Sequence, residues 1–374
     1  MTLPPPTGRP TVRSLRPDEW SAALEYCQAQ GADGVMAASR IAAAGGALAE
    51  SWGAARPDPV YRAQGQVEPT QNRFDAAQDQ LEAAKTQSEP AQTQDTRAAA
   101  GRPGHRPRPQ GASPRPGHTG DRPGRQSTWG APAHGAVWAV ERSSGGRLTA
   151  DQIDGLAWAG GNLVVMGVDQ TAAGSLANQV HQTGGRYASV VGEASAVEAV
   201  WRKLRQVWPA PRSIRPCQPS LATNSPPLVR PDPRVRVATP DMLNLLEPAC
   251  RAMFIEELGF APAGPSQGYR QRVAAQLAER AIMALIDPAS GQVVFKAEFG
   301  AQYGSWVQIQ GVWTASDWRG RGFGKAGMAA MVLEARRRGW TNVCLYVNDF
   351  NAPALAVYRA VGFRRVGTWA TVMF

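Results

Sequence analysis

A glycine-rich, basic turn near the C-terminus constrains the fold more than any other part of the sequence. Residues 305–318 have the pattern of a strand, and the turn 319–324 leads from it into a helix whose apolar residues recur at helical spacing. A second strand and a second helix follow within residues 341–363. This order predicts an α/β arrangement with a ligand pocket where the strand turns into the helix.

The turn itself predicts an anion-binding site. Gly320, Gly322 and Gly324 let the backbone come close to a ligand. The first amides of the following helix have no partner within the helix and lie at the positive end of its dipole. Arg321 and Lys325 add fixed positive charge, so a phosphate group fits this position.

Two common phosphate-binding motifs fit this context poorly. Three glycines within residues 322–327 satisfy a dinucleotide fingerprint, but that fold needs several more strand-helix units than remain before Phe374. A mononucleotide P-loop also fails, because Arg319 stands where its first glycine belongs and Ala326 where its Ser or Thr belongs.

The turn resembles instead the glycine-rich loop of the GNAT acetyltransferases, whose pattern R/Q-x-x-G-x-G/A is met by Arg319, Gly322 and Gly324. The resemblance covers residues 231–374, a length ordinary for one domain. It implies a central mixed, mostly antiparallel sheet flanked by helices. It also implies acetyl-CoA, or another acyl-CoA, as the donor.

The second half of the family pattern is present as well. Family members continue with a strand, an Asn that opens a helix, a Tyr seven residues later, and then Gly-Phe. The matching residues here are Asn351, Tyr358, Gly362 and Phe363. Two helical turns separate Asn351 from Tyr358, about 10 Å along one face, so both can act on one ligand.

The resemblance also implies roles for single residues. The CoA diphosphate is assigned to Arg319, Gly320, Arg321, Gly322, Phe323, Gly324 and Lys325. Backbone groups of Val312 and Thr314, at the splayed end of the preceding strand, would hold the acyl carbonyl and the pantetheine arm.

Tyr358, protonated at neutral pH with an ordinary pKa of about 10, would give a proton to the departing thiolate. The alternative for Tyr358 is a half-buried helix aromatic, and we favour the catalytic role.

The general base is not assigned by the resemblance. Many family members carry a Glu on the strand before the Asn, where this chain has Tyr346. Glu298 is the leading candidate, because strand alternation places it on one face with Lys296. Asp317, Asp349 and a water chain are the other options, and a solvated strand-face carboxylate is the alternative for Glu298.

Two predicted helices upstream, 240–258 and 267–281, would wall the acceptor site in a fold of this family. Four of their residues are candidate acceptor contacts, although acidic helix residues often form only the solvated face: Phe254, Glu256, Glu257 and Tyr269.

Residues 10–56 and 133–228 predict one N-terminal α/β domain, interrupted by an insertion. The expected strands are 135–142, 155–167 and 187–192, and the expected helices are 170–183 and 193–207. The pattern resembles the diverged, GNAT-like N-terminal domain of bacterial two-domain GNAT proteins, whose function the resemblance leaves open.

Two further expectations concern this N-terminal domain. Its Gly160-Gly161-Asn162 turn has no basic neighbour, so we expect it not to bind CoA. Its tryptophans are predicted to pack in the core rather than to line a pocket: Trp138, Trp158, Trp201 and Trp208.

The insertion, residues 57–132, is predicted to be disordered, because it has almost no aliphatic residues able to form a core. Residues 74–87 suit one transient helix. Residues 101–126 carry six arginines and one aspartate, a composition that can contact RNA or another polyanion. We favour a soluble extended linker, since no aromatic residues lie between the arginines.

Composition argues against a membrane-spanning, exported or metal-binding protein. The formal net charge is +10, and no apolar segment is long enough to span a membrane or to serve as an export signal. Four scattered cysteines lack metal spacing and suit reduced thiols in a cytoplasmic, metal-free protein.

The predicted function is an N-acyltransferase in which a primary amine attacks acetyl-CoA directly in a ternary complex. The alternatives are a catalytically silent acyl-CoA-binding regulatory protein and an RNA- or ribosome-associated module. The sequence does not define the acceptor, small molecule or protein, or the oligomeric state.

Overall fold

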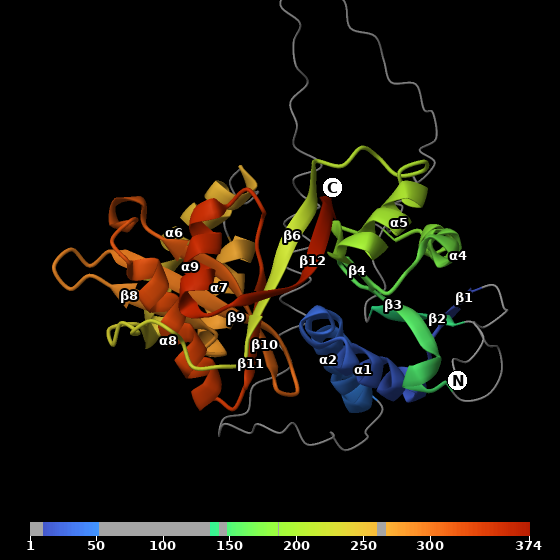
Figure 1. Ribbon diagram of the computed structural model, residues 1–374, viewed down its shortest axis with the longest axis horizontal. Coiled ribbons are helices and arrows are strands. Elements are labelled where there is room, and N and C mark those ends of the chain that lie inside the picture. Colours follow the sequence, from blue (N-terminus) through green and yellow to red (C-terminus); the bar gives the residue numbers. More distant parts are fainter. Residues whose placement is uncertain (1–9, 52–134, 142–147, 186, 260–266) are drawn as a thin grey trace, which may run out of the picture.

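The computed structural model describes residues 10–51, 135–141, 148–185, 187–259 and 267–374. The predicted insertion, with its transient helix at 74–87 and its arginine-rich part at 101–126, lies outside the described residues. Within them the chain forms one mixed α/β structure with two lobes (Figure 1).

The two halves of the chain repeat the same order of elements. The first half contains β1 (Thr11–Ser14), α1 (Trp20–Ala29), α2 (Val35–Ser51), β2 (Ala136–Glu141), β3 (Ile153–Ala159), β4 (Leu163–Met166), α4 (Gln170–Gln182), β5 (Ser189–Glu193), α5 (Ala194–Leu204) and β6 (Ser213–Thr223). The second half contains β7 (Arg236–Val237), α6 (Leu243–Leu258), α7 (Gln267–Ala278), β8 (Ile282–Ile286), β9 (Val293–Tyr303), β10 (Trp306–Thr314), α8 (Phe323–Arg337), β11 (Asn342–Tyr346), α9 (Ala352–Val361) and β12 (Arg364–Met373).

All these strands join one sheet in which the halves exchange their last strands. The order is β1-β2-β3-β4-β5-β12-β6-β11-β10-β9-β8-β7, and replacing each strand by its counterpart in the other half gives the same order reversed. Thus β12 pairs with β5, β6 pairs with β11, and β6 and β12 lie side by side between the lobes (Figure 1). Neither half completes its own sheet.

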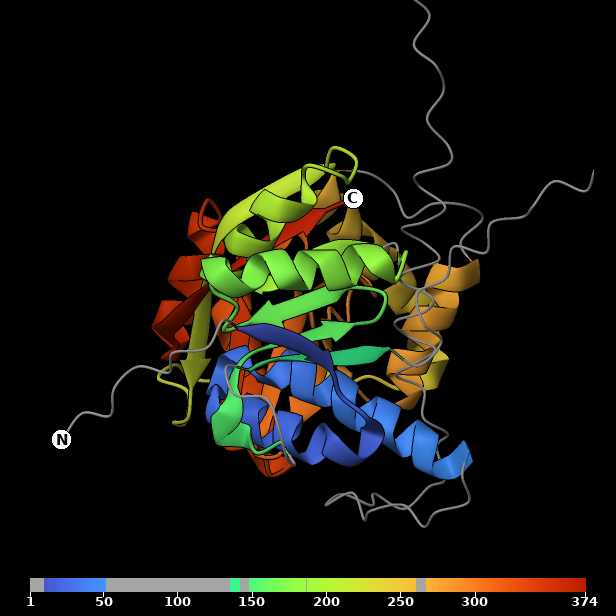
Figure 2. The ribbon, with the colours of Figure 1, turned by 90° about the vertical axis from the view of Figure 1, so that its right-hand side faces the viewer.

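The sheet is mostly antiparallel, as expected, with β4–β5 and β10–β11 as the parallel pairs among the described strands. Figure 2 shows α4 and α5 on one face of the first-half strands and α1 and α2 on the other. In the second half, α8 and α9 cover the face that carries Phe295, while α6 and α7 pack around Ile282 and Ala284. Gly327 lets α8 come close to β9, because a Cβ there would lie 2.6 Å from the Phe295 ring.

The tryptophans of the first half confirm the prediction of core packing. Trp138 and Trp158 are buried, and Trp201 and Trp208 pack from the edge against the cluster under α4 and α5.

One strand prediction was wrong. Residues 155–167, expected as a single strand, form the β3–β4 hairpin with Leu156 paired to Met166. The chain reverses at Gly160, whose amide donates to the carbonyl of Asn162 at 3.1 Å. Both strands are largely buried and apolar, which favoured one long strand, but the Gly160-Gly161-Asn162 segment between them was a turn signal.

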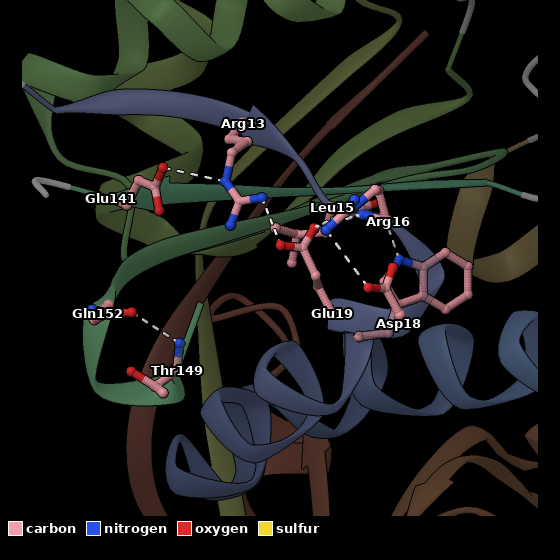
Figure 3. A network of polar contacts seen from close by, with 9 residues as sticks. Arg13, Leu15, Arg16, Asp18, Glu19, Glu141, Thr149 and Gln152 are labelled. Carbon is pink, nitrogen blue, oxygen red and sulfur yellow. Dashed lines mark hydrogen bonds and ion pairs between the residues drawn. The ribbon is translucent and has the colours of Figure 1, made fainter. Parts of the chain in front are cut away.

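A buried polar network fixes the first strand to the sheet (Figure 3). The guanidinium of Arg13 donates to Glu19 Oε1 at 2.7 Å and to Glu141 Oε1 at 3.2 Å. Glu19 is only 5% exposed. The hydrogen bond from Arg13 holds the pKa of the Glu19 carboxyl below its usual value, against the opposing effect of burial.

Glu19→Gln is expected to lower the free energy of unfolding at pH 7 by about 1.5–3 kcal/mol, the range for a hydrogen bond to a charged group. Because the folded pKa of Glu19 is depressed, its contribution is present above the unfolded pKa and is lost as the pH falls through the folded value. Urea unfolding at pH 7 and pH 3.5 checks this. The difference between variant and wild type should shrink at the lower pH, and an equal difference at both would contradict the assignment.

Candidate functional site

The parallel strands β10 and β11 separate partway along their length. They pair only from Trp306 to Gln308, opposite Asn342 to Cys344. Beyond this point β10 continues to Thr314 with β9 as its partner, and the register shifts between Gln310 and Trp313. From Ile309 onward, β10 therefore has no ladder partner among the described strands on its β11 side. We call this separation of the two strands the gap; a splayed strand end was predicted at Val312 and Thr314.

Gly311 allows the register shift in β10 to lie directly over the side chain of Glu298. Its φ is +58°, a conformation that favours glycine, and a Cβ there would lie 2.7 Å from the carboxyl carbon of Glu298. An isolated glycine inside a strand pattern is a bulge signal, so the sequence VQIQGVWT contained this information.

The loop after β10 places an uncapped helix N-terminus beside the gap. Gly320 and Gly322 have φ of +73° and +87°, and α8 begins at Phe323. No described side chain caps the first amides of α8, and the first bond back into the turn joins the Ala326 amide to the Gly322 carbonyl at 3.1 Å. Arg321 and Lys325 are exposed here. The geometry is that of an anion site.

The corresponding position in the first half is filled by the chain itself. Only three residues separate β4 from α4, and Asp169 Oδ1 accepts from the amides of Thr171 at 3.0 Å and Ala172 at 2.8 Å. Glu193 Oε2 accepts from the Gly167 amide at 2.9 Å, and the β4–β5 pairing extends to Gly192 without a splay. These carboxylates take the place of an external anion, which supports the expectation that this half does not bind CoA.

Asn351 and Tyr358 lie on α9, next to the same gap. Asn351 Oδ1 accepts from the Ala354 amide at 3.2 Å, so this side chain caps the helix, and its amide nitrogen can still donate to a ligand. Tyr358 is 6% exposed and packs edge-on against Phe363, with ring centroids 6.0 Å apart. Burial raises the pKa of the Tyr358 phenol, with a smaller effect of the Glu257 charge, and this keeps the hydroxyl protonated at neutral pH.

The structure does not favour Glu298 as a general base. Its carboxylate is 2% exposed, and it accepts from Lys296 Nζ and from Gln276 Nε2, both at 2.6 Å. Burial alone would raise the pKa of Glu298, but the charges of Lys296 and Arg272 hold it below its usual value. The solvated strand-face alternative is wrong as well, because α6 and α7 cover this face.

The position of the family glutamate is occupied by an aromatic stack on β11 and β12, which a residue of the first half holds in place. Tyr346 stacks on Trp369 with ring centroids 4.9 Å apart and an interplanar angle of 14°. The Trp369 indole in turn donates to Asp33, which lies between α1 and α2. The hydrogen bond between Trp369 and Asp33 could not be predicted from the sequence, because the two residues are 336 positions apart.

The candidate acceptor contacts divide into two kinds. Phe254 and Tyr269 are buried, and they pack edge-on with centroids 5.7 Å apart, so they belong to the core under α6 and α7. Glu256 and Glu257 are exposed at the C-terminal end of α6. Glu256 accepts hydrogen bonds from Trp313 and Arg319, and Glu257 pairs with Arg215.

Metal and membrane features are absent from the parts of the chain that the structure describes. No group of three His, Cys, Asp or Glu residues there is arranged to hold a metal ion. No helix among them combines the length and apolar character needed to cross a bilayer. The four cysteines, Cys27, Cys217, Cys250 and Cys344, are free thiols.

Comparison with known proteins divides the chain in two. Residues 246–363 match the model of the acetyltransferase (GNAT) family, and residues 135–246 match a domain of unknown function, DUF4081. A curated mycothiol acetyltransferase from Saccharomonospora viridis is 44% identical over 70 residues, which is 19% of this chain and 22% of that protein. The match thus spans about a fifth of that relative.

Solved structures resemble the fold over longer stretches. A Drosophila protein covers 97% of this chain and 98% of its own, with 10% identity and a TM-score of 0.51. A GCN5-related N-acetyltransferase from Sphaerobacter thermophilus covers 63% of this chain and 80% of its own, with 18% identity and a TM-score of 0.42.

Proposed function

Because residues 246–363 form a domain of the acetyltransferase (GNAT) family, we propose that this chain is an N-acyltransferase that moves an acetyl group from acetyl-CoA to a primary amine. The observation that carries the proposal is the uncapped N-terminus of α8 beside the gap between β10 and β11. The amides of Phe323, Gly324 and Lys325, with Arg321, suit the diphosphate. The unpaired edge of β10 suits an extended pantetheine arm.

The proposed chemistry uses few side chains. Acetyl-CoA supplies the thioester. The acceptor ammonium gives one proton to a water chain, and the neutral amine attacks the thioester carbonyl while a main-chain amide near Val312 stabilises the oxyanion. The attacking nitrogen then gives its second proton to water as the C–S bond breaks. Tyr358, kept protonated by its burial, gives a proton to the departing thiolate. Glu298 holds the irregular segment of β10 from below, through its contact with Gly311, and is a positioning residue in this scheme.

The acceptor class remains broader than one compound. A compound related to mycothiol is one candidate, because the curated relative carries that name, and its match lies over a fifth of its length. We further propose a cytoplasmic location, which suits the free thiols.

An acceptor screen tests the proposal. Full-length protein is incubated with acetyl-CoA and a panel of small amines, aminothiols, lysine peptides and peptides with free N-termini, and thiol release is measured. We expect release that depends on one class of amine. Donor binding without release in any mixture would favour the silent acyl-CoA-binding protein, and absence of donor binding would contradict both.

A further inference from the structure

Glu256 connects the donor side of the site to the acceptor side. Its Oε1 accepts from the Trp313 indole nitrogen at 3.1 Å, and its Oε2 accepts from Arg319 Nη2. Glu256 lies in the last turn of α6, Trp313 on the splayed part of β10, and Arg319 at the start of the glycine-rich turn. One carboxylate therefore joins α6 to the unpaired part of β10 and to the start of the glycine-rich turn.

Two nitrogens of the Arg319 guanidinium are engaged in this arrangement. Besides its ion pair with Glu256, its Nε donates to the Thr314 carbonyl at 2.9 Å. Its guanidinium is thus turned toward α6 rather than toward the amides of α8. The side chains of Arg319 and Glu256 are 50% and 46% exposed, so water and salt already weaken their attraction. A diphosphate at the start of α8 would present more negative charge than one carboxylate.

We propose that Glu256 competes with the donor's diphosphate for Arg319, and that the released carboxylate, still held by Trp313, then receives the ammonium group of the acceptor. The inference rests on the proposed function and specifies that the acceptor arrives as a cation. Toward the donor, Glu256 acts only through Arg319; toward the acceptor, it is a binding residue. Its neighbour Glu257 has a different partner, Arg215 at 3.3 Å, and offers a matched comparison.

Calorimetric titration of CoA into the full-length protein tests the competition. Glu256→Gln should lower the Kd for CoA about two- to fivefold, the range for loss of one exposed ion pair. The glutamine oxygen still accepts from Trp313, so the packing is kept. Glu257→Gln, with the same charge change, should leave the Kd unchanged.

The same Glu256→Gln change in an Arg319→Gln protein separates competition for Arg319 from a structural effect of the substitution. In an Arg319→Gln protein, adding Glu256→Gln should give no further gain in CoA affinity, because the shared partner is gone. An unchanged or higher Kd in Glu256→Gln, or an equal gain in the Glu257 or Arg319 comparison, would overturn the inference.

The proposed contact between Glu256 and the acceptor ammonium is tested by the KM for the amine. With the amine found in the screen, Glu256→Gln should raise KM for the amine about tenfold while kcat changes little, since only binding of the cation is lost. An unchanged KM would overturn this part.

If wild-type protein does not bind CoA, the proposed function fails. If it binds CoA but Glu256→Gln has no effect, only the present inference fails.

Discussion

Arg321→Glu combined with Gly322→Asp is expected to abolish the thermal stabilisation that acetyl-CoA gives to this protein. A donor present at 100 times its Kd stabilises the folded state by about 2.7 kcal/mol, and the variant should lose all of it. Both changes bring negative charge to the start of α8. In the first half of the chain, the carboxylate of Asp169 already accepts from the amides of Thr171 and Ala172 in α4. A carboxylate at position 322 would repel the diphosphate from the start of α8.

The controls separate this effect from general damage. Gly322 has a φ of +87°, so aspartate there costs some stability by itself, and the melting temperature without donor must be compared first. Lys203→Glu changes the charge by the same amount as Arg321→Glu on the exposed face of α5 and should keep the full shift. A shift that survives in the double variant would contradict the phosphate assignment.

Tyr358→Phe should lower kcat by about 10²- to 10⁴-fold, the usual contribution of a positioned general acid. The change removes one oxygen and keeps the ring that packs on Phe363 and the core under α8. The Kd for acetyl-CoA should therefore stay within about twofold of the wild-type value. Single-turnover thiol release and CoA titration measure the two quantities separately.

The pH dependence gives a further check on Tyr358. Burial raises the pKa of its phenol above the ordinary value, so the acid stays protonated through the neutral and mildly alkaline range. Wild-type kcat should show no loss between pH 7 and pH 9 from this group. A kcat unaffected by Tyr358→Phe would remove the residue from the mechanism.

Local signals in the sequence predicted the elements around the candidate donor site. The glycines of the turn, the asparagine that caps α9 and the glycine that ends it at Gly362 each act within a few residues of their own position. Such signals need no knowledge of distant strands. For the same reason the start of α8 and the placement of Tyr358 on α9 were predictable.

The exchange of β6 and β12 was not predictable in this way. Each strand has edges that accept a partner from either half, and the choice depends on contacts such as Leu221 with Leu345 and Val191 with Thr371. The alternation of residues along β9 placed Glu298 on the correct face of the strand. It did not reveal that the carboxylate is buried. The burial arises because α7 packs over this face, and Gln276 on α7 donates a hydrogen bond to the Glu298 carboxylate.

A crystal structure of the full-length protein with acetyl-CoA tests the central claim most directly. The account predicts that the diphosphate lies within hydrogen-bonding distance of the amides of Phe323, Gly324 and Lys325, with the acyl group between β10 and β11. It also predicts no donor at the start of α4, where Asp169 holds the amides. A donor bound in the first half, or an α8 N-terminus closed by the chain itself, would contradict it.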